Sequence, residues 1–285
     1  MFKGLLKPVC AILAVMGFMA LNPAMAAWEL DMPVGVTTLS DMIRSLHREI
    51  LLICTVVGVL LFSVMGYALF KFRKSKGAKA AKFSHNTTAE IIWTVIPILI
   101  LIYIAVPSAK AILEIEDASN PDMTIKITGY QWKWEYDYLD DGVHFYANMD
   151  AESASAARLG SDKNVMEIEH YLRDVDNRMI VPVNKKVRIL LTADDVIHAW
   201  WVPELYIKKD AIPGFINEMW FQATKTGVFR GQCAELCGRG HGFMPIVVEV
   251  VSEEEYAEWV AANGGNTEEA VADAEISTDN TVAAL

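Results

Sequence analysis

Two long apolar runs, residues 50–70 and 91–109, limit what this chain can fold into more than any other feature. The first contains 21 residues and the second 19, and neither contains a charged side chain. About 20 such residues span the hydrocarbon core of a bilayer as a helix. With 53% hydrophobic residues overall, the chain is poorly suited to a purely soluble fold. The runs therefore predict two membrane spans that form a helical hairpin.

The charges on either side of these runs predict the orientation of the hairpin. The connecting segment, residues 71–90, carries one acidic residue, Glu90, and six basic ones: Lys71, Arg73, Lys74, Lys76, Lys79 and Lys82. Basic loops stay in the cytoplasm, so both outer ends of the hairpin face outward. From residue 114 onward the chain has 31 acidic and 14 basic side chains, a balance of −17. This acidic outward region is expected to attract a basic partner and to repel nucleic acid.

The two ends of the chain have their own signals. Lys3 and Lys7 precede an apolar stretch and the small residues Ala24 and Ala26, which predicts a signal peptide over residues 1–26. An uncleaved anchor helix is the alternative, although the apolar run is short and Pro23 interrupts it. Residues 263–285 are small and acidic, and we expect them to be disordered.

The outward region reads as a β domain. Residues 122–262 alternate short β-rich runs with turn signals, including one aromatic run over residues 129–138 that is predicted as a strand. Only residues 253–262 have a helical pattern. The predicted fold class is an α+β membrane protein. Its organisation is an outer segment with a transmembrane hairpin over 27–112, followed by a β-sandwich or barrel over 113–262.

Five metal-binding side chains lie close together near the end of this domain. Residues 233–244 contain Cys233, Glu235, Cys237, His241 and Met244. Soft sulfur combined with imidazole favours copper, and cupredoxins build their sites from such a loop between two strands. A further imidazole, His198, lies far upstream after a predicted strand and can close the site from a neighbouring loop.

Two simpler interpretations stay open at this point. Cysteines in exported domains usually form disulfides, and Cys233 and Cys237 are the only pair in this domain. However, only three residues separate them, which makes the geometry of a disulfide demanding. Alternatively, two Cys and two His can hold a structural zinc ion, but that site has no use for Met244.

The pattern Cys-x-Glu-x-Cys-x-x-x-His-x-x-Met, preceded by His198, resembles the binuclear copper A motif of the cytochrome c oxidase subunit II family. The resemblance extends over both predicted spans and a cupredoxin-like domain. It implies a centre of two copper ions bridged by the thiolates of Cys233 and Cys237. By the same resemblance, the imidazoles of His198 and His241 each bind one copper. Met244 caps one copper through its thioether, and Glu235 binds through its backbone carbonyl. The resemblance also implies that the Glu235 carboxylate binds a magnesium ion shared with subunit I.

The resemblance assigns roles to two further residues. Trp132 matches the tryptophan through which electrons pass from cytochrome c to copper, although a ring in this run could simply be part of the core. Glu90 matches the acid at the mouth of a proton-uptake channel, although an acid at a helix N-terminus is often only a partner of the helix dipole. Tyr130 stands where the family more often has His, and Phe215 where it often has Arg, so the roles of those family residues are not transferred.

The implied function is that of subunit II of a proton-translocating cytochrome c oxidase in the bacterial inner membrane. Electrons would pass from cytochrome c to copper and then to haem in subunit I, where O2 is reduced to water while protons are pumped. Subunit I, subunit III and lipid are the expected neighbours. Six acids are expected to steer a Lys-rich cytochrome c: Asp137, Asp140, Asp141, Asp176, Asp194 and Asp195.

Three other functions fit parts of this sequence. Quinol oxidase subunit II shares the fold but has lost copper, and the complete ligand set argues against it. A nitrous oxide reductase-like copper carrier would not need two spans with a basic cytoplasmic loop. A copper chaperone needs an exchangeable site, whereas this one is predicted to be closed. The chain contains no Cys-x-x-Cys-His sequence, so a fused c-type haem is not expected.

Overall fold

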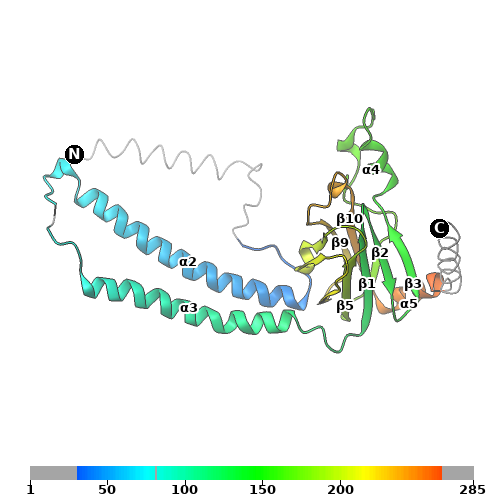
Figure 1. Ribbon diagram of the computed structural model, residues 1–285, viewed down its shortest axis with the longest axis horizontal. Helices are drawn as coiled ribbons and strands as arrows, with labels where there is room; N and C mark the ends of the chain where they lie inside the picture. Colours follow the sequence, from blue (N-terminus) through cyan, green and yellow to red (C-terminus); the bar gives the residue numbers. More distant parts are fainter. Residues whose placement is uncertain (1–30, 81, 265–285) are drawn as a thin grey trace, which may run out of the picture. The chain divides into compact units, whose positions relative to one another are not determined.

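The computed structural model describes residues 31–80 and 82–264, which contain a helical hairpin and a β domain (Figure 1). The predicted signal peptide and residues 265–285 of the predicted tail lie outside the described residues.

Both apolar runs lie within long helices, α2 (Thr38–Lys71) and α3 (Thr87–Ile115). Each helix is long and apolar enough to cross a membrane, and most of their large apolar side chains are exposed, as lipid-facing surfaces require. Helix α2 begins well before its apolar run because Thr37 caps it: the Thr37 hydroxyl accepts a hydrogen bond from the backbone N–H of Ser40. The predicted hairpin of two spans is therefore confirmed.

The β domain has ten strands in two five-stranded sheets, which confirms the predicted sandwich. The strands are β1 (Met123–Tyr130), β2 (Lys133–Tyr138), β3 (Val143–Ala147), β4 (Met179–Pro182), β5 (Lys186–Ala193), β6 (His198–Val202), β7 (Ile207–Ala211), β8 (Asn217–Gln222), β9 (Gly227–Cys233) and β10 (Pro245–Val251). The first sheet has the order β3-β2-β1-β5-β8 and the second β4-β10-β9-β6-β7. Pairs β1–β5 and β4–β10 are parallel, whereas the other pairs are antiparallel.

The core lies between the sheets. Burial alternates residue by residue along β2 and β5, as expected for strands with one face on a core. Trp134 and Tyr136 from the first sheet and Trp200 from the second are fully buried, and the Trp200 Nε1–H donates to the Tyr136 hydroxyl at 3.3 Å. Strand β6 therefore contributes Trp200 to the core and His198 to the group of predicted metal ligands.

Replacing Trp200 with alanine is expected to lower the free energy of unfolding by about 3–5 kcal/mol, the usual cost of truncating a large buried aromatic residue. Urea unfolding of the full chain in detergent, followed by near-ultraviolet circular dichroism, measures this change. Trp201→Ala is the matched control, because the adjacent Trp201 side chain is exposed and its loss should cost far less. Equal losses for the two variants would show that Trp200 is not a core residue.

Two details of the predicted secondary structure were wrong. The aromatic run 129–138 is not one strand, because β1 ends at Tyr130 and β2 begins at Lys133, which leaves Gln131 and Trp132 in a turn. Helix α5 (Glu253–Asn263) was predicted, but the short helix α4 (Ala151–Ala156) was not. Its six small or polar residues lack an apolar period, and its start depends on Asp150, which accepts a hydrogen bond from the Ser153 N–H. Within residues 31–80 and 82–264 there are also four short 3-10 turns: η2 (Lys74–Lys76), η3 (Val165–Glu167), η4 (Pro203–Leu205) and η5 (His241–Phe243).

Candidate metal centre

The predicted ligands come from three neighbouring parts of the second sheet. His198 is the first residue of β6, and Cys233 is the last residue of β9, which pairs with β6. The loop between β9 and β10 supplies the others: Glu235, Cys237, His241 at the start of η5, and Met244 just before β10. Antiparallel pairing places Cys233 opposite Trp200. The strand register thus brings His198 to the loop although it precedes Cys233 by 35 positions in the sequence.

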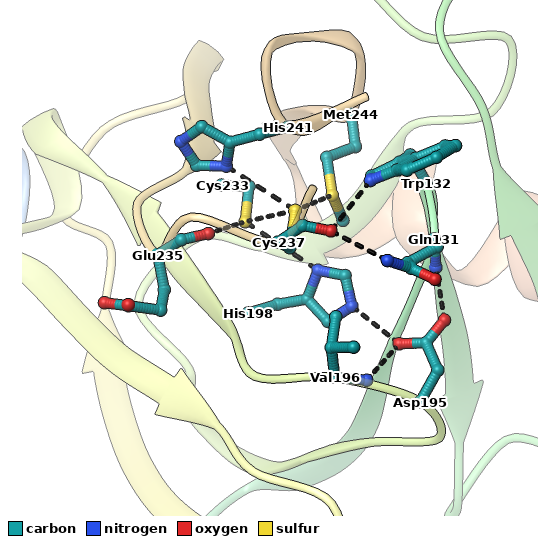
Figure 2. A network of polar contacts seen from close by, with 10 residues as sticks. All are labelled: Gln131, Trp132, Asp195, Val196, His198, Cys233, Glu235, Cys237, His241 and Met244. Carbon is teal, nitrogen blue, oxygen red and sulfur yellow. Dashed lines mark hydrogen bonds and ion pairs between the residues drawn. The ribbon is translucent and has the colours of Figure 1, made fainter. Parts of the chain in front are cut away.

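The side chains of these residues converge on one another (Figure 2). The two cysteine sulfurs lie 3.8 Å apart and, like Cys54, both cysteines are free among the described residues, so they do not form the alternative disulfide. His198 Nδ1 lies 3.9 Å from the Cys233 sulfur. The Cys237 sulfur lies 3.5 Å from His241 Nδ1 and 3.6 Å from the Met244 sulfur.

Glu235 turns its backbone toward this cluster and its side chain away from it. Its carbonyl oxygen lies 3.3 Å from the Cys233 sulfur, and Figure 2 shows the carboxylate pointing away from the sulfurs. The side chain is exposed. Glu235 therefore offers a carbonyl to the centre and a separate carboxylate to its surroundings.

The ionisation of the paired thiols favours a cation between them. Burial acts to raise the pKa of Cys233, but its contacts with His198 and with the backbone of Ala199 and Glu235 lower it overall. The pKa of Cys237 is raised, by burial and by the charge of Cys233. Two thiolates this close repel each other, so both ionise readily only when a positive ion neutralises them.

Whether a metal fits can be judged from the distances and the donor types. A metal–thiolate bond is about 2.3 Å long, so one ion can bind both sulfurs at their separation of 3.8 Å. A structural zinc site needs four ligands, but here the Met244 thioether and the Glu235 carbonyl also face the cysteines. The soft donor set of thiolate, thioether and imidazole fits copper.

Asp195 contacts the His198 ring at Nε2, the ring nitrogen that is not near the Cys233 sulfur. Its Oδ1 lies 2.9 Å from His198 Nε2, and its Oδ2 accepts the Gln131 backbone N–H at 2.6 Å. Burial acts to raise the pKa of Asp195, but these hydrogen bonds and one from the Val196 N–H lower it overall. From the sequence alone, Asp195 is predicted only as one of the acids that steer a partner. The signal for its other role was its spacing, three residues before a ligating histidine.

Replacing Asp195 with alanine is expected to weaken copper binding about 10–100-fold, the usual cost of losing a carboxylate that orients a ligating histidine. Competition with a copper chelator, measured on the purified full chain, gives the affinity. Asp194→Ala is the control, because no contact with His198 is found for this neighbouring exposed residue in the described structure. An unchanged affinity in the Asp195 variant would show that His198 needs no such support.

Trp132 contacts the same loop from the β1–β2 turn. Its Nε1–H donates to the Cys237 carbonyl at 3.1 Å, and the Gln131 side-chain amide donates to that oxygen at 2.9 Å. The indole packs so closely on Gly240 that a Cβ there would lie 2.2 Å from the ring. The Arg239 guanidinium lies 5.6 Å from the ring centroid. The half-buried Trp132 therefore connects the surface to a residue of the cluster.

Other residues singled out from the sequence lie apart from this cluster. Glu90 is half-buried in the first turn of α3, where its Oε1 accepts the Asn86 N–H at 3.2 Å. The Tyr130 hydroxyl donates a hydrogen bond to Glu135 at 3.0 Å. The pKa of Tyr130 is raised, mainly by burial and also by the negative charge of Glu135. Phe215 is exposed.

The six acids expected to steer a partner do not form one group. Asp194 and Asp195 lie beside the β1–β2 turn, since Asp194 N bonds to Gly129 O and Asp195 to Gln131. Asp140 and Asp141 follow the opposite end of β2, where Asp140 accepts the Thr124 N–H. Only part of the predicted acidic surface therefore lies next to Trp132.

The fold and site together define a class of membrane-anchored proteins in which a two-sheet β domain carries a cluster of side chains able to hold a metal ion. Family models for the periplasmic and transmembrane domains of cytochrome c oxidase subunit II match residues 123–251 and 25–111. The chain belongs to the cytochrome c oxidase subunit II family. It is a subunit of a haem-copper oxidase, with two membrane helices and a periplasmic domain that carries a cluster consistent with the copper site of this family.

Individual relatives agree with this assignment. The chain is 43% identical over 235 residues to a probable cytochrome c oxidase subunit 2 of Rickettsia prowazekii, covering 82% of this chain and 72% of the relative. It is 39% identical over 246 residues to subunit 2 of Cereibacter sphaeroides, covering 82% and 80%. A crystal structure of the periplasmic domain of subunit II from Bradyrhizobium japonicum is 45% identical, with a TM-score of 0.44, over 51% of this chain and 96% of that one.

Proposed function

We propose that this chain accepts electrons from cytochrome c at Trp132, holds them at a centre of two copper ions, and passes them to haem in subunit I. The observation that carries the proposal is the pair of buried, free cysteines 3.8 Å apart, with imidazole and thioether donors on both sides. Cys233 and Cys237 would hold the two copper ions between their thiolates, and a pair bound in this way would supply electron transfer in which one electron is shared and few bonds rearrange.

The protein keeps most of this donor set buried and fixed in place. His198, Cys233, Cys237 and Met244 are each less than one-tenth exposed, and His198 is held by Asp195. Ligands held by two paired strands and a packed loop have little freedom to rearrange. All of the donors also point at one another, which leaves no position for a substrate. The arrangement therefore supports electron transfer and not the chemistry of O2.

Trp132 supports the first step, because its indole is half-buried and hydrogen-bonded to the Cys237 carbonyl. A donor haem near this ring would have a short bonded route to a cysteine ligand. Rapid mixing of reduced cytochrome c with the purified oxidase tests the order of events. The copper absorbance is expected to change before that of the haem in subunit I, and reduction of the haem first would contradict the proposal.

The Glu235 carboxylate supports the predicted magnesium ion shared with subunit I. It is exposed and points away from the sulfurs, and hard carboxylate oxygens suit that ion. In the assembled oxidase, Glu235→Gln is expected to lose bound magnesium while keeping its copper, because the backbone carbonyl remains. Metal analysis that finds magnesium unchanged would contradict this assignment.

Glu90 is proposed to admit protons from the cytoplasmic side. Because Glu90 also accepts a hydrogen bond at the start of α3, alanine would remove both roles at once. Glu90→Gln separates them, since the amide oxygen can still accept the Asn86 N–H but the side chain cannot carry a proton. Turnover and proton pumping by Glu90→Gln oxidase in vesicles are expected to fall as far as in Glu90→Ala, and normal pumping in Glu90→Gln would contradict the proposal.

A further inference from the structure

An exposed tryptophan marks the outer face of the second sheet. Successive residues of a strand point to opposite faces, so Trp200 lies in the core while Trp201 is 40% exposed on the other side. Trp201 pairs with Lys208 of β7 and with Gln232 of β9. The Lys208 ammonium lies 5.9 Å from the centroid of the Trp201 ring.

Next to this ring is a cavity of about 270 Å³, here called the Trp201 cavity. It is lined by Arg173, Trp201, Pro203, Arg230, Gly231 and Gln232. The Trp201 ring, the proline and the glycine form the apolar part of the lining. The two arginine guanidinium groups and the glutamine amide provide hydrogen-bond donors. Its volume is below the range of about 300–1,000 Å³ typical of sites for drug-sized ligands, so one inserted side chain suits it better.

Both charged residues that line the Trp201 cavity are basic. Arg230 and Arg178 share Asp174, and Arg178 also pairs with Glu249. In contrast, neither Arg173 nor Lys208 forms an ion pair within residues 31–80 and 82–264. An excess of positive charge is unusual in a region whose overall balance is −17. The cavity therefore favours an anionic occupant.

The Trp201 cavity also borders a turn tied to the first membrane helix. Pro203 opens η4, whose Glu204 carbonyl accepts the Val36 N–H at 2.9 Å, and whose Leu205 carbonyl accepts the Thr37 hydroxyl at 3.1 Å. Thr37 is the cap of α2. These contacts place the turn at the outer end of that helix, where a neighbouring membrane subunit can reach it.

We propose that the Trp201 cavity binds an acidic loop of a membrane-embedded neighbouring subunit of the same oxidase. A carboxylate of that loop lies between Arg173 and Arg230, and an adjacent apolar side chain packs on Trp201. Arg pairs with carboxylates through two parallel hydrogen bonds, and Trp and Arg are enriched among the residues that dominate interface energies. The proposal rests on the membership of this chain in the oxidase, and not on the identity of its metal.

The position of the cavity links such a contact to the metal centre. Gln232 lines the cavity and directly precedes Cys233, and Gly231 packs so closely on the Trp201 carbonyl that a Cβ there would lie 1.9 Å from its oxygen. A partner seated on Trp201 and Gln232 would therefore brace the two strands that present His198 and Cys233.

A photo-crosslinking amino acid placed at Gln232 in the assembled oxidase, in native membranes, tests the proposal. Mass spectrometry is expected to find a crosslink to a membrane subunit, in a peptide with Asp or Glu beside the linked residue. Arg173→Glu should reduce its yield at least about tenfold, the scale for breaking a desolvated charge pair. Replacing the partner acid with lysine should restore the yield. The same amino acid at exposed Lys225 serves as the control.

Four outcomes would overturn the proposal: a crosslink to lipid, a crosslink to a peptide without a carboxylate, a yield that Arg173→Glu leaves unchanged, or no crosslink from either Gln232 or Lys208. The copper spectrum of each variant is recorded in parallel. A variant with normal copper and no crosslink contradicts the docking surface alone, whereas abnormal copper in the unsubstituted chain would contradict the proposed function.

Discussion

Replacing Cys237 with serine is expected to remove the copper centre and to abolish oxidation of cytochrome c by the assembled oxidase. The Cys237 sulfur lies within 4 Å of the Cys233 sulfur, His241 Nδ1 and the Met244 sulfur, so it is the shared point of the donor set. A serine hydroxyl is a harder ligand that does not ionise near neutral pH, and it cannot replace a bridging thiolate. Copper analysis of the purified chain and oxygen consumption by the oxidase measure the two losses.

Cys54→Ser provides the control for this substitution. Cys54 is an exposed residue of α2, well outside the β domain, so its replacement should leave copper content and turnover unchanged. If the Cys237 variant kept two copper ions per chain and normal turnover, the proposed thiolate bridge would be wrong.

Replacing Trp132 with alanine is expected to leave copper in place but to slow reduction of the copper centre by cytochrome c. The variant loses the ring that a donor would contact and the hydrogen bond to the Cys237 carbonyl. Truncating a tryptophan at the centre of an interface commonly costs about 2 kcal/mol or more, so the second-order rate should fall at least about tenfold. Rapid-mixing absorbance at the copper band gives this rate.

Two further variants show which property of Trp132 matters. Trp132→Phe keeps an aromatic ring but cannot donate to Cys237, so an intermediate rate is expected if both ring and hydrogen bond contribute. Leu159→Ala removes a fully exposed apolar side chain elsewhere on the β domain and should leave the rate unchanged. Reduction of the Trp132→Ala enzyme at the normal rate, with its copper spectrum intact, would exclude Trp132 as the route.

Features with a strong local signal could be predicted from the sequence. The spans were predictable because residues 50–70 and 91–109 have no charge and the right length. Most of the donor set was predictable because five of the six predicted ligands lie within residues 233–244, and the sixth, His198, follows a predicted strand that can place it beside them. The structure confirms that these side chains meet, since β6 pairs with β9.

Features that depend on tertiary contacts could not be predicted in the same way. The turn at Gln131 and Trp132 interrupts an aromatic run with no Gly or Pro to mark it. The contact between Asp195 and His198 could not be predicted, because Asp195 is positioned by a hydrogen bond from Gln131 in the distant β1–β2 turn. The separation of Asp140 and Asp141 from Trp132 likewise follows from strand direction, because the two acids and Trp132 lie at opposite ends of β2.

The central claim, that this chain carries a centre of two copper ions bridged by Cys233 and Cys237, is tested most directly by electron paramagnetic resonance of the copper-loaded full chain. One electron shared equally by two copper nuclei gives a seven-line hyperfine pattern, which is the result we predict, together with purple colour and two copper ions per chain. A four-line spectrum from a single copper ion, or a chain that binds no copper, would contradict the claim.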